Sequence, residues 1–208
     1  GAGYIGSILV KDLLDNNNQV TVLDNLIFQQ NSLLDCCNYE NFEFIKGDIC
    51  DYDLMKKILP KFDIIIPLAA IVGAPACKKN PTLTKLVNDE SYIFLIENLS
   101  MDQKVLFPTT NSGYGIGSKS EFCTEETPMN PISEYGITKV KIEKAFLDRG
   151  NSITFRLATV FGMSPRMRMD LLVNDFVYRA VKDRAVVLFE SQFKRNYIHV
   201  RDVTRVFQ

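Results

Sequence analysis

Tyr135 and Lys139 are the pair of residues in this sequence with the clearest capacity for chemistry. They are four residues apart, so on a helix they share one face and the ammonium can lower the pKa of the phenol. A phenol with a lowered pKa can take a proton from an alcohol or sugar hydroxyl near neutral pH. The same spacing occurs twice more in the chain, so the pair needs support from other residues.

That support begins at the first residue. Residues 1–6 read Gly-Ala-Gly-Tyr-Ile-Gly and lead directly into an apolar helical pattern. Glycines allow a tight turn and a close approach to a pyrophosphate, which the amides of a helix N-terminus then bind. A predicted strand over residues 19–23 ends at Asp24, where a carboxylate can accept hydrogen bonds from the adenosine ribose. These features predict a dinucleotide site.

The residues around Asp24 favour one dinucleotide over the other. No Lys or Arg occurs from Asp12 to Ile45. The 2′-phosphate of NADP would need a cation near this strand end, and the Asp24 carboxylate would repel it. NAD is therefore the predicted cofactor.

The loop in a dinucleotide fold follows a strand, but no residue precedes Gly1 in this sequence. That strand is central in a doubly wound sheet, so its absence would leave neighbouring strands without a partner. The sequence also stops at Gln208, within a predicted helix. We interpret the chain as a fragment truncated at both ends.

Composition narrows the function classes. The net charge is −1 and no basic run occurs, so nucleic acid and anionic membranes are poor partners. The most apolar stretch, residues 64–72, is too short to span a bilayer and contains Pro67, which predicts a buried parallel strand running into a loop. His199 is the single histidine, so no His-rich metal site is expected and a structural role is predicted for it. These properties predict a cytoplasmic enzyme without a metal.

The elements that would position these residues alternate along the chain. Strands are predicted over residues 19–23, 42–45, 62–68, 104–109 and 152–157, and helices over 51–59, 82–100, 134–148 and 171–181. This order predicts an α/β fold with a doubly wound parallel sheet. Residues 1–160 would be the NAD-binding Rossmann domain without its first strand, and residues 161–208 the start of a smaller, truncated substrate-binding region.

The element map also separates the three Tyr/Lys pairs. The helix with Tyr135 and Lys139 follows a strand that ends in hydroxyl side chains, Thr109 and Thr110, and points toward the cofactor crevice. The other pairs, Tyr52/Lys56 and Tyr178/Lys182, lie on helices away from that strand end, where packing or solvated contacts are expected.

Several motifs follow one another along the whole chain. They are residues 1–6, Asp24-Asn25, Gly47-Asp48-Ile49, Leu68-Ala69-Ala70, Thr110 four residues before Tyr114-Gly115, Tyr135-x-x-x-Lys139, Arg156 and residues 195–200. Together these motifs resemble the extended short-chain dehydrogenases/reductases, and most closely the nucleotide-sugar epimerase/dehydratase branch typified by UDP-glucose 4-epimerase. The resemblance covers essentially the whole chain. Residues 111–117 and 166–176 are also similar to GDP-heptose-modifying members that oxidise C4.

The resemblance implies a role for each matching residue. Tyr135 would be the base, Lys139 would hold the nicotinamide ribose and keep Tyr135 partly ionised, and Thr110 would bind the same sugar oxygen. The substrate would be a nucleotide-diphosphate sugar, with Arg195 on its diphosphate. The implied cofactor contacts are Gly1, Gly3, Tyr4, Ile5, Gly6, Asp24, Asn25, Asp48, Ile49, Leu68, Ala69, Ala70, Asn88, Tyr135 and Lys139, and the further substrate contacts are Asn111, Ser112 and Asn174.

Several alternatives stay open. The dehydratases place an Asp-Glu pair after the catalytic Thr, whereas this sequence has Asn111 and Ser112, which are poor proton carriers. This difference favours C4 epimerisation, oxidation or reduction over 4,6-dehydration. A non-catalytic dinucleotide-binding module is the alternative from another class. The resemblance also implies a homodimer formed by the helices 82–100 and 134–148, which carry the apolar residues Tyr92, Ile93, Leu95 and Ile96 on more than one face.

Overall fold

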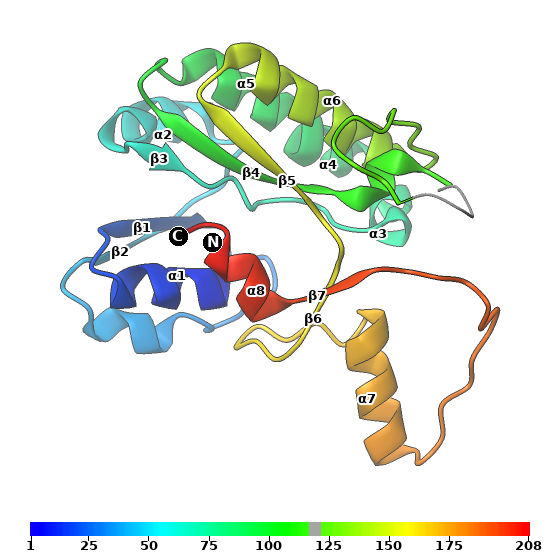
Figure 1. Ribbon diagram of the computed structural model, residues 1–208. Helices are drawn as coiled ribbons and strands as arrows, with labels where there is room; N and C mark the ends of the chain where they lie inside the picture. Colours follow the sequence, from blue (N-terminus) through cyan, green and yellow to red (C-terminus); the bar gives the residue numbers. More distant parts are fainter. Residues whose placement is uncertain (117–121) are drawn as a thin grey trace. The chain divides into compact units, whose positions relative to one another are not determined.

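The structure is a computed structural model that describes residues 1–116 and 122–208 (Figure 1). Residue 117, the last of the 111–117 motif, lies outside the described residues. The strands are β1 Val20–Asp24, β2 Phe42–Lys46, β3 Ile64–Ile65, β4 Lys104–Thr110, β5 Ser152–Leu157, β6 Thr159–Phe161 and β7 Tyr197–His199. The α-helices are α1 Gly6–Asp15, α2 Tyr52–Ile58, α3 Ala74–Lys79, α4 Pro81–Lys85, α5 Ser91–Asn98, α6 Glu134–Arg149, α7 Leu172–Lys182 and α8 Val200–Arg205. The short helices are η1 Leu34–Asn38, η2 Leu59–Lys61, the π-helix η3 Leu86–Glu90 and η4 Asn111–Tyr114.

Parallel pairing of strands confirms the predicted α/β class. β1 pairs with β2, β3 with β4 and β6 with β7, each pair in parallel. The described strands form three separate sheets, in the orders β1-β2, β3-β4-β5 and β6-β7. β1 and β3 therefore each have one unpaired edge among the described strands, which agrees with the expectation that neighbouring strands would lack a partner.

The chain folds into two compact units, residues 1–46 with 157–208 and residues 47–156, and each unit is described by itself. The division at residue 160 into an NAD-binding domain and a substrate-binding region stays a prediction.

The unit of residues 1–46 and 157–208 is built around the first predicted helix. α1 buries Leu9, Val10 and Leu14 on one face, as its apolar spacing predicts. α8 packs against α1, and the Thr204 hydroxyl donates to an Asp12 carboxylate oxygen at 2.6 Å. This packing fixes the helix that follows the glycine loop.

The unit of residues 47–156 has an aromatic core. α6 packs against β4 and α5, and in Figure 1 both helices lie on the same side of β4 and β5. Tyr92, Phe107 and Phe146, from α5, β4 and α6, are almost completely buried and contact one another. Three rings from three elements therefore fix the position of α6 on the strand that precedes it.

Two predicted elements of this unit differ in the structure. The strand expected over 62–68 is only β3, because β3 is an edge strand and Pro67 lacks the N–H that would continue the ladder. Its Ile64 is 53% exposed, so the prediction of a buried strand is wrong at this residue. The helix expected over 82–100 runs from Pro81 to Asn98 and contains the π-helix η3, which shifts the helical register by one residue.

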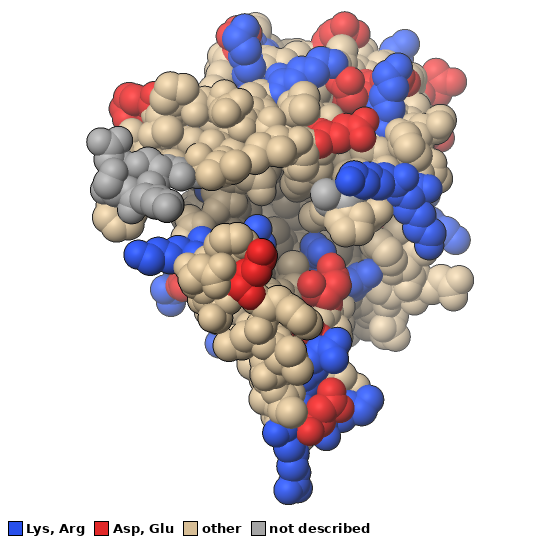
Figure 2. All heavy atoms as spheres, turned by 90° about the vertical axis from the view of Figure 1, so that its right-hand side faces the viewer, with Lys and Arg blue, Asp and Glu red and all other residues tan. Residues whose placement is uncertain are grey.

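The charged surface agrees with the interspersed charges of the sequence. On the face drawn in Figure 2, acidic and basic side chains are intermixed. Within residues 1–116 and 122–208, no helix is both long enough and apolar enough to cross a membrane.

Candidate active site

Tyr135 and Lys139 both lie on α6, where their spacing puts them one helical turn apart. The helix begins after Ser133, whose hydroxyl accepts a hydrogen bond from the Gly136 amide at 3.1 Å and so caps the first turn. Tyr135 is half-buried and Lys139 is 6% exposed. The predicted pair is therefore built on a capped helix, with the lysine inside the protein and the tyrosine at the boundary with solvent.

The Lys139 ammonium occupies an apolar environment. It lies 4.5 Å from the ring centre of Phe107 and 5.4 Å from that of Tyr92. Its hydrogen bond goes to the Pro108 carbonyl oxygen at 3.4 Å. Burial lowers the pKa of Lys139 to about 8, because the charged form loses its hydration.

Thr110 ends β4, two residues after the carbonyl that Lys139 contacts. Its hydroxyl oxygen accepts a hydrogen bond from the Ser112 amide at 3.1 Å and starts η4. A Cβ added to Gly136 would be 3.4 Å from the Ser112 carbonyl oxygen, so the first turn of α6 lies against η4. The structure thus brings Lys139, Thr110, Asn111 and Ser112 to one end of β4, next to the helix turn that carries Tyr135.

The other two Tyr/Lys pairs make local contacts, as the sequence predicts. Lys182 lies 5.1 Å from the ring centre of Tyr178, which is 45% exposed on α7. Tyr52 instead stacks on Phe94 with 4.1 Å between ring centres, and Lys56 lies 5.7 Å from the same Phe94 ring. Neither lysine is buried, so neither resembles Lys139.

The glycine loop is tightly packed at Gly6 and open at Gly3. A Cβ on Gly6 would be 2.0 Å from the Gly1 carbonyl oxygen, so Gly6 allows the start of α1 to touch the backbone at the start of the loop. A Cβ on Gly3 would meet no atom within 4 Å, so the space beside Gly3 is open. Close contact at one glycine and open space at the other are what a loop needs if its backbone is to approach a pyrophosphate.

The Asp24 carboxylate fastens this loop to the chain that follows β1. It accepts hydrogen bonds from the amides of Ala2 and Leu26, each at 2.8 Å, and from the Gln30 side chain at 3.4 Å. In return, the Ser32 hydroxyl donates to the Ala2 carbonyl oxygen at 2.7 Å. The sequence predicted a ribose contact for Asp24 but did not predict that its carboxylate would bind the backbone of the glycine loop. The short turn from Asp24 to Leu26 is the sequence feature that could have indicated such a bond.

Residues 1–208 match the family model described as "NAD dependent epimerase/dehydratase family". The chain belongs to this family. It is 34% identical over 170 residues to UDP-glucose 4-epimerase of Lactobacillus helveticus, an alignment that covers 79% of this chain and 50% of that enzyme.

Two solved structures of family members also superpose on the chain. UDP-glucose 4-epimerase from Thermotoga maritima with UDP-glucose has a TM-score of 0.86 and 27% identity, covering 99% of this chain and 69% of that one. UDP-glucuronic acid 4-epimerase from Bacillus cereus, with UDP-glucuronic acid and NAD, has a TM-score of 0.84 and 26% identity, covering 98% and 68%. The chain thus spans from half to about two thirds of the length of these relatives.

Two cofactor residues that the epimerase/dehydratase resemblance implies, Asn88 and Ala69, bind neighbouring segments of their own unit. Asn88, in η3, is 3% exposed and bonds to both the amide and the carbonyl of Ile71, at 2.8 Å each. It thereby holds the segment that follows Leu68, Ala69 and Ala70. The Ala69 carbonyl in turn accepts a hydrogen bond from the Tyr92 hydroxyl at 2.6 Å.

The other predicted cofactor residues stand at element ends. Asp48 and Ile49 follow β2 and are half-buried, and an Asp48 carboxylate oxygen accepts from the Cys50 amide at 2.9 Å. Asn25 is exposed directly after β1, and Tyr4 and Ile5 complete the glycine loop before α1. Contact of these residues with a cofactor stays a prediction.

Asn174, a predicted substrate contact, is engaged inside the protein. Its side-chain oxygen accepts from the Gly162 amide at 2.9 Å, and its nitrogen donates to the Arg168 carbonyl at 2.9 Å and to the Tyr4 hydroxyl at 3.2 Å. The Tyr4 hydroxyl donates to the Gly162 carbonyl at 2.6 Å. Tyr4 of the glycine loop is therefore tied to the start of α7, a link that sequence spacing does not reveal.

Arg195, the residue predicted to bind the substrate diphosphate, is exposed.

Arg166 modifies the electrostatic argument about the cofactor. Its guanidinium carbon lies 4.1 Å from the ring centre of Phe28, in the chain that follows Asp24. The sequence has no cation from residue 12 to residue 45, but the fold supplies one from a distant segment. A cation from outside residues 12–45 therefore lies near the chain that follows Asp24, and the predicted NAD agrees with the description of the family as NAD-dependent.

Arg156 organises the chain after η4. It donates to Glu143 at 2.7 Å, to the Tyr114 hydroxyl at 2.9 Å and to the Glu125 carbonyl at 3.0 Å. Glu143 is 2% exposed, so this is a largely buried ion pair. The resemblance included Arg156 without a role, and the structure gives it one.

His199 has the structural role that was predicted. Its ring nitrogen accepts from the Arg201 amide at 3.3 Å and caps α8. The ring also packs edge-on against Phe161 and close to Gly162, where a Cβ would be 2.5 Å from the imidazole.

Proposed function

We propose that the protein is an NAD-dependent oxidoreductase or epimerase that acts on a hydroxyl, at C4, of a nucleotide-diphosphate sugar. One observation carries the proposal: a buried lysine without an ion-pair partner in the described structure bonds to the Pro108 carbonyl, two residues before Thr110 at the end of β4 and one helical turn from Tyr135. A buried charge is costly, and it is retained where a ligand or a reaction uses it.

The chemistry of the residues supports this role. Bound NAD would accept the hydride from the sugar carbon. Tyr135 would take the proton of the same carbon's hydroxyl, and the Lys139 ammonium would lower the pKa of the phenol so that it is a base near neutral pH. Thr110 would bind the sugar oxygen and fix its distance from Tyr135.

The glycine loop and the lysine fit the cofactor. The open space at Gly3 suits the pyrophosphate. The Lys139 ammonium has donors left for ribose hydroxyls, because among the described residues it forms one hydrogen bond, to a backbone carbonyl. Asp24 would accept hydrogen bonds from the hydroxyls of the adenosine ribose. These residues are the ones we assign to NAD.

The substrate class follows from the relatives. The two solved relatives hold UDP-glucose and UDP-glucuronic acid, which supports a nucleotide-diphosphate sugar here. Arg195 is exposed and would bind the diphosphate, since a guanidinium matches phosphate oxygens. Asn111 and Ser112 would line the sugar site, whereas Asn174 would act through the bonds that hold its neighbours.

Two alternatives fit less well. A 4,6-dehydratase needs proton carriers at positions 111 and 112, and the amide of Asn111 does not titrate. A non-catalytic binding module has no need of a buried cation beside Tyr135 and Thr110, because burial of an unpaired charge is destabilising.

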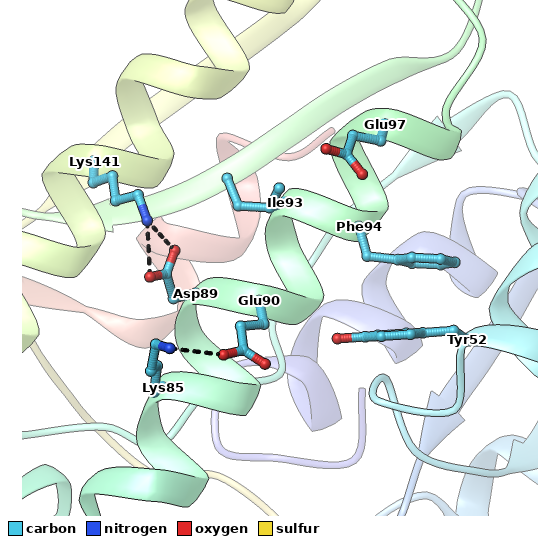
Figure 3. Close-up of a pocket in the computed structure, with 8 residues that line it drawn as sticks. All are labelled: Tyr52, Lys85, Asp89, Glu90, Ile93, Phe94, Glu97 and Lys141. Atoms are coloured by element: carbon cyan, nitrogen blue, oxygen red, sulfur yellow. Dashed lines mark hydrogen bonds and ion pairs between the residues drawn. The ribbon is translucent and has the colours of Figure 1, made fainter.

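A homodimer through α5 and α6 is part of the proposal. Tyr92 and Leu95 belong to the core of their own unit, each 1% exposed, so the predicted contact must use other residues. The outer face carries a shallow pocket of about 440 Å³ with Ile93 among five charged side chains, and Lys141 pairs there with Asp89 (Figure 3). Tyr135, Lys139 and Thr110 do not line this pocket. Sedimentation velocity, which measures the oligomeric state, tests the homodimer. The cytoplasmic location stays a prediction.

The experiment is a comparison of two tyrosines with the same spacing to a lysine. The purified protein is checked for bound NAD and then given UDP-glucose and UDP-glucuronic acid while NADH absorbance and sugar products are followed. Tyr135→Phe should lower the rate by about 100-fold or more, because the base is lost. Tyr178→Phe, in the exposed pair on α7, should keep the rate. Full turnover by Tyr135→Phe would overturn the assignment.

A further inference from the structure

The Lys139 ammonium is buried, and few polar groups of the described chain hold it in place. Lys139 forms no ion pair in the part of the chain that the structure describes. Its bond to the Pro108 carbonyl is long, at 3.4 Å. The rings of Phe107 and Tyr92 lie over the ammonium, with centres 4.5 and 5.4 Å from its nitrogen.

Both rings are fixed by their own contacts. Phe107 is completely buried on β4, and Tyr92 is 1% exposed on α5. The two rings meet edge to face, with 5.5 Å between centres and 64° between planes. The Tyr92 hydroxyl donates to the carbonyls of Ala69 and Pro67, at 2.6 and 3.2 Å. Burial raises the pKa of Tyr92, so it stays a neutral phenol.

We propose that Phe107 and Tyr92 form an aromatic seat for the Lys139 ammonium and act as positioning residues of the reaction. The face of an aromatic ring attracts a cation through its quadrupole, most strongly when the cation is desolvated. The inference rests on the proposed function, because the purpose of the seat is to aim the charge at Tyr135.

Rings suit this purpose better than a carboxylate would. A carboxylate beside Lys139 would neutralise its field, and the phenol of Tyr135 would then keep an ordinary pKa. Aromatic faces favour the charged lysine and leave its net charge intact. The seat therefore keeps the cation protonated without cancelling its effect on Tyr135.

Other titratable groups on neighbouring elements are directed elsewhere. Asp89 of η3 pairs with Lys141, and Glu143 of α6 pairs with Arg156. Cys77 of α3 bonds to the Ile71 carbonyl, and Tyr114 of η4 bonds to the Thr124 carbonyl. Tyr92 on α5 faces Lys139, Tyr135 stands one helical turn before it on α6, and Lys104 begins the opposite end of β4.

The test compares two buried phenylalanines. Phe107→Leu removes a ring that faces the ammonium. Phe146→Leu removes a ring that is also completely buried and lies 4.9 Å from Phe107 between ring centres, but the cation–π contacts of Lys139 in the described residues are with Phe107 and Tyr92. The protonation of Lys139 is followed by NMR of carbon-13-labelled lysine, with the signal assigned by its loss in Lys139→Met. Phe107→Leu should lower the midpoint of the Lys139 titration by about one pH unit, which means that Lys139 binds its proton about tenfold more weakly. Phe146→Leu should change the proton affinity of Lys139 by less than about twofold.

Tyr92 supplies a second pair of variants if Phe107→Leu does not fold. Tyr92→Leu should lower the midpoint, and Tyr92→Phe, which retains the ring, should restore it. Equal midpoints in Phe107→Leu and Phe146→Leu, or in the two Tyr92 variants, would overturn the inference.

Activity separates this inference from the proposed function. In the active protein, the alkaline limb of the pH–rate profile should move down with Phe107→Leu and stay in place with Phe146→Leu. Midpoints that shift as expected without any turnover of nucleotide sugars would refute the proposed function and leave the seat intact. Turnover that depends on Tyr135 with unmoved midpoints would refute the seat alone.

Discussion

Replacing Lys139 by Met should stabilise the protein while removing its activity. Lys139 is 6% exposed, and burial lowers its pKa from 10.5 to about 8. One pKa unit corresponds to about 1.4 kcal/mol, so carrying the charge at pH 7 costs the folded state about 3 kcal/mol. Met has a similar length and no charge, so Lys139→Met should raise the free energy of unfolding at pH 7 by about this amount.

The pH dependence gives the sharper test. Between the folded pKa and the unfolded pKa, the unfolded chain holds more protons than the folded protein, so the wild-type free energy of unfolding rises with pH relative to Lys139→Met. The advantage of the variant should therefore fall from about 3 kcal/mol at pH 7 to about 1 kcal/mol at pH 10.

The assay is urea unfolding of NAD-free protein at both pH values. Lys144→Met is the matched control on the same helix, since the Lys144 side chain is 79% exposed and should change stability by less than about 0.5 kcal/mol. A Lys139→Met variant less stable than the wild type at pH 7, or a difference that does not shrink by pH 10, would refute the reasoning.

Two further predictions concern the glycine loop and the buried ion pair. Gly3→Ala should leave the melting temperature unchanged and weaken NAD binding at least about tenfold, because its methyl group would occupy the open space assigned to the pyrophosphate. Gly6→Ala should instead lower the melting temperature, since its Cβ would overlap the Gly1 carbonyl oxygen. Calorimetry and NAD titration of both variants test these two predictions, and equal melting temperatures for Gly3→Ala and Gly6→Ala would contradict them. Arg156→Met should reduce the free energy of unfolding by about 3 kcal/mol in urea, because it leaves Glu143 charged and buried without its partner. An Arg156→Met change below about 1 kcal/mol would show that water or another group compensates Glu143.

Short-range patterns in the sequence were enough to predict the parts of the site that lie on one element or its turn. The glycine loop, α1, β1 with Asp24, and the Tyr135/Lys139 pair on α6 all stand where their spacing predicts. These features depend on periodicity, on the conformational freedom of glycine and on a serine cap, and each acts within a few residues.

The surroundings of these residues depend on segments that are distant in the chain. Lys139 is seated by Phe107 from β4 and Tyr92 from α5, while Asn174 is occupied by Tyr4 from the glycine loop. Likewise, the edge position of β3 shortened a strand that its apolar residues had predicted to be longer. The sequence by itself determined which groups could react and on which elements they stand. Tertiary structure alone decided their burial, partners and charge state, because packing between distant segments controls hydration and leaves no regular spacing to read.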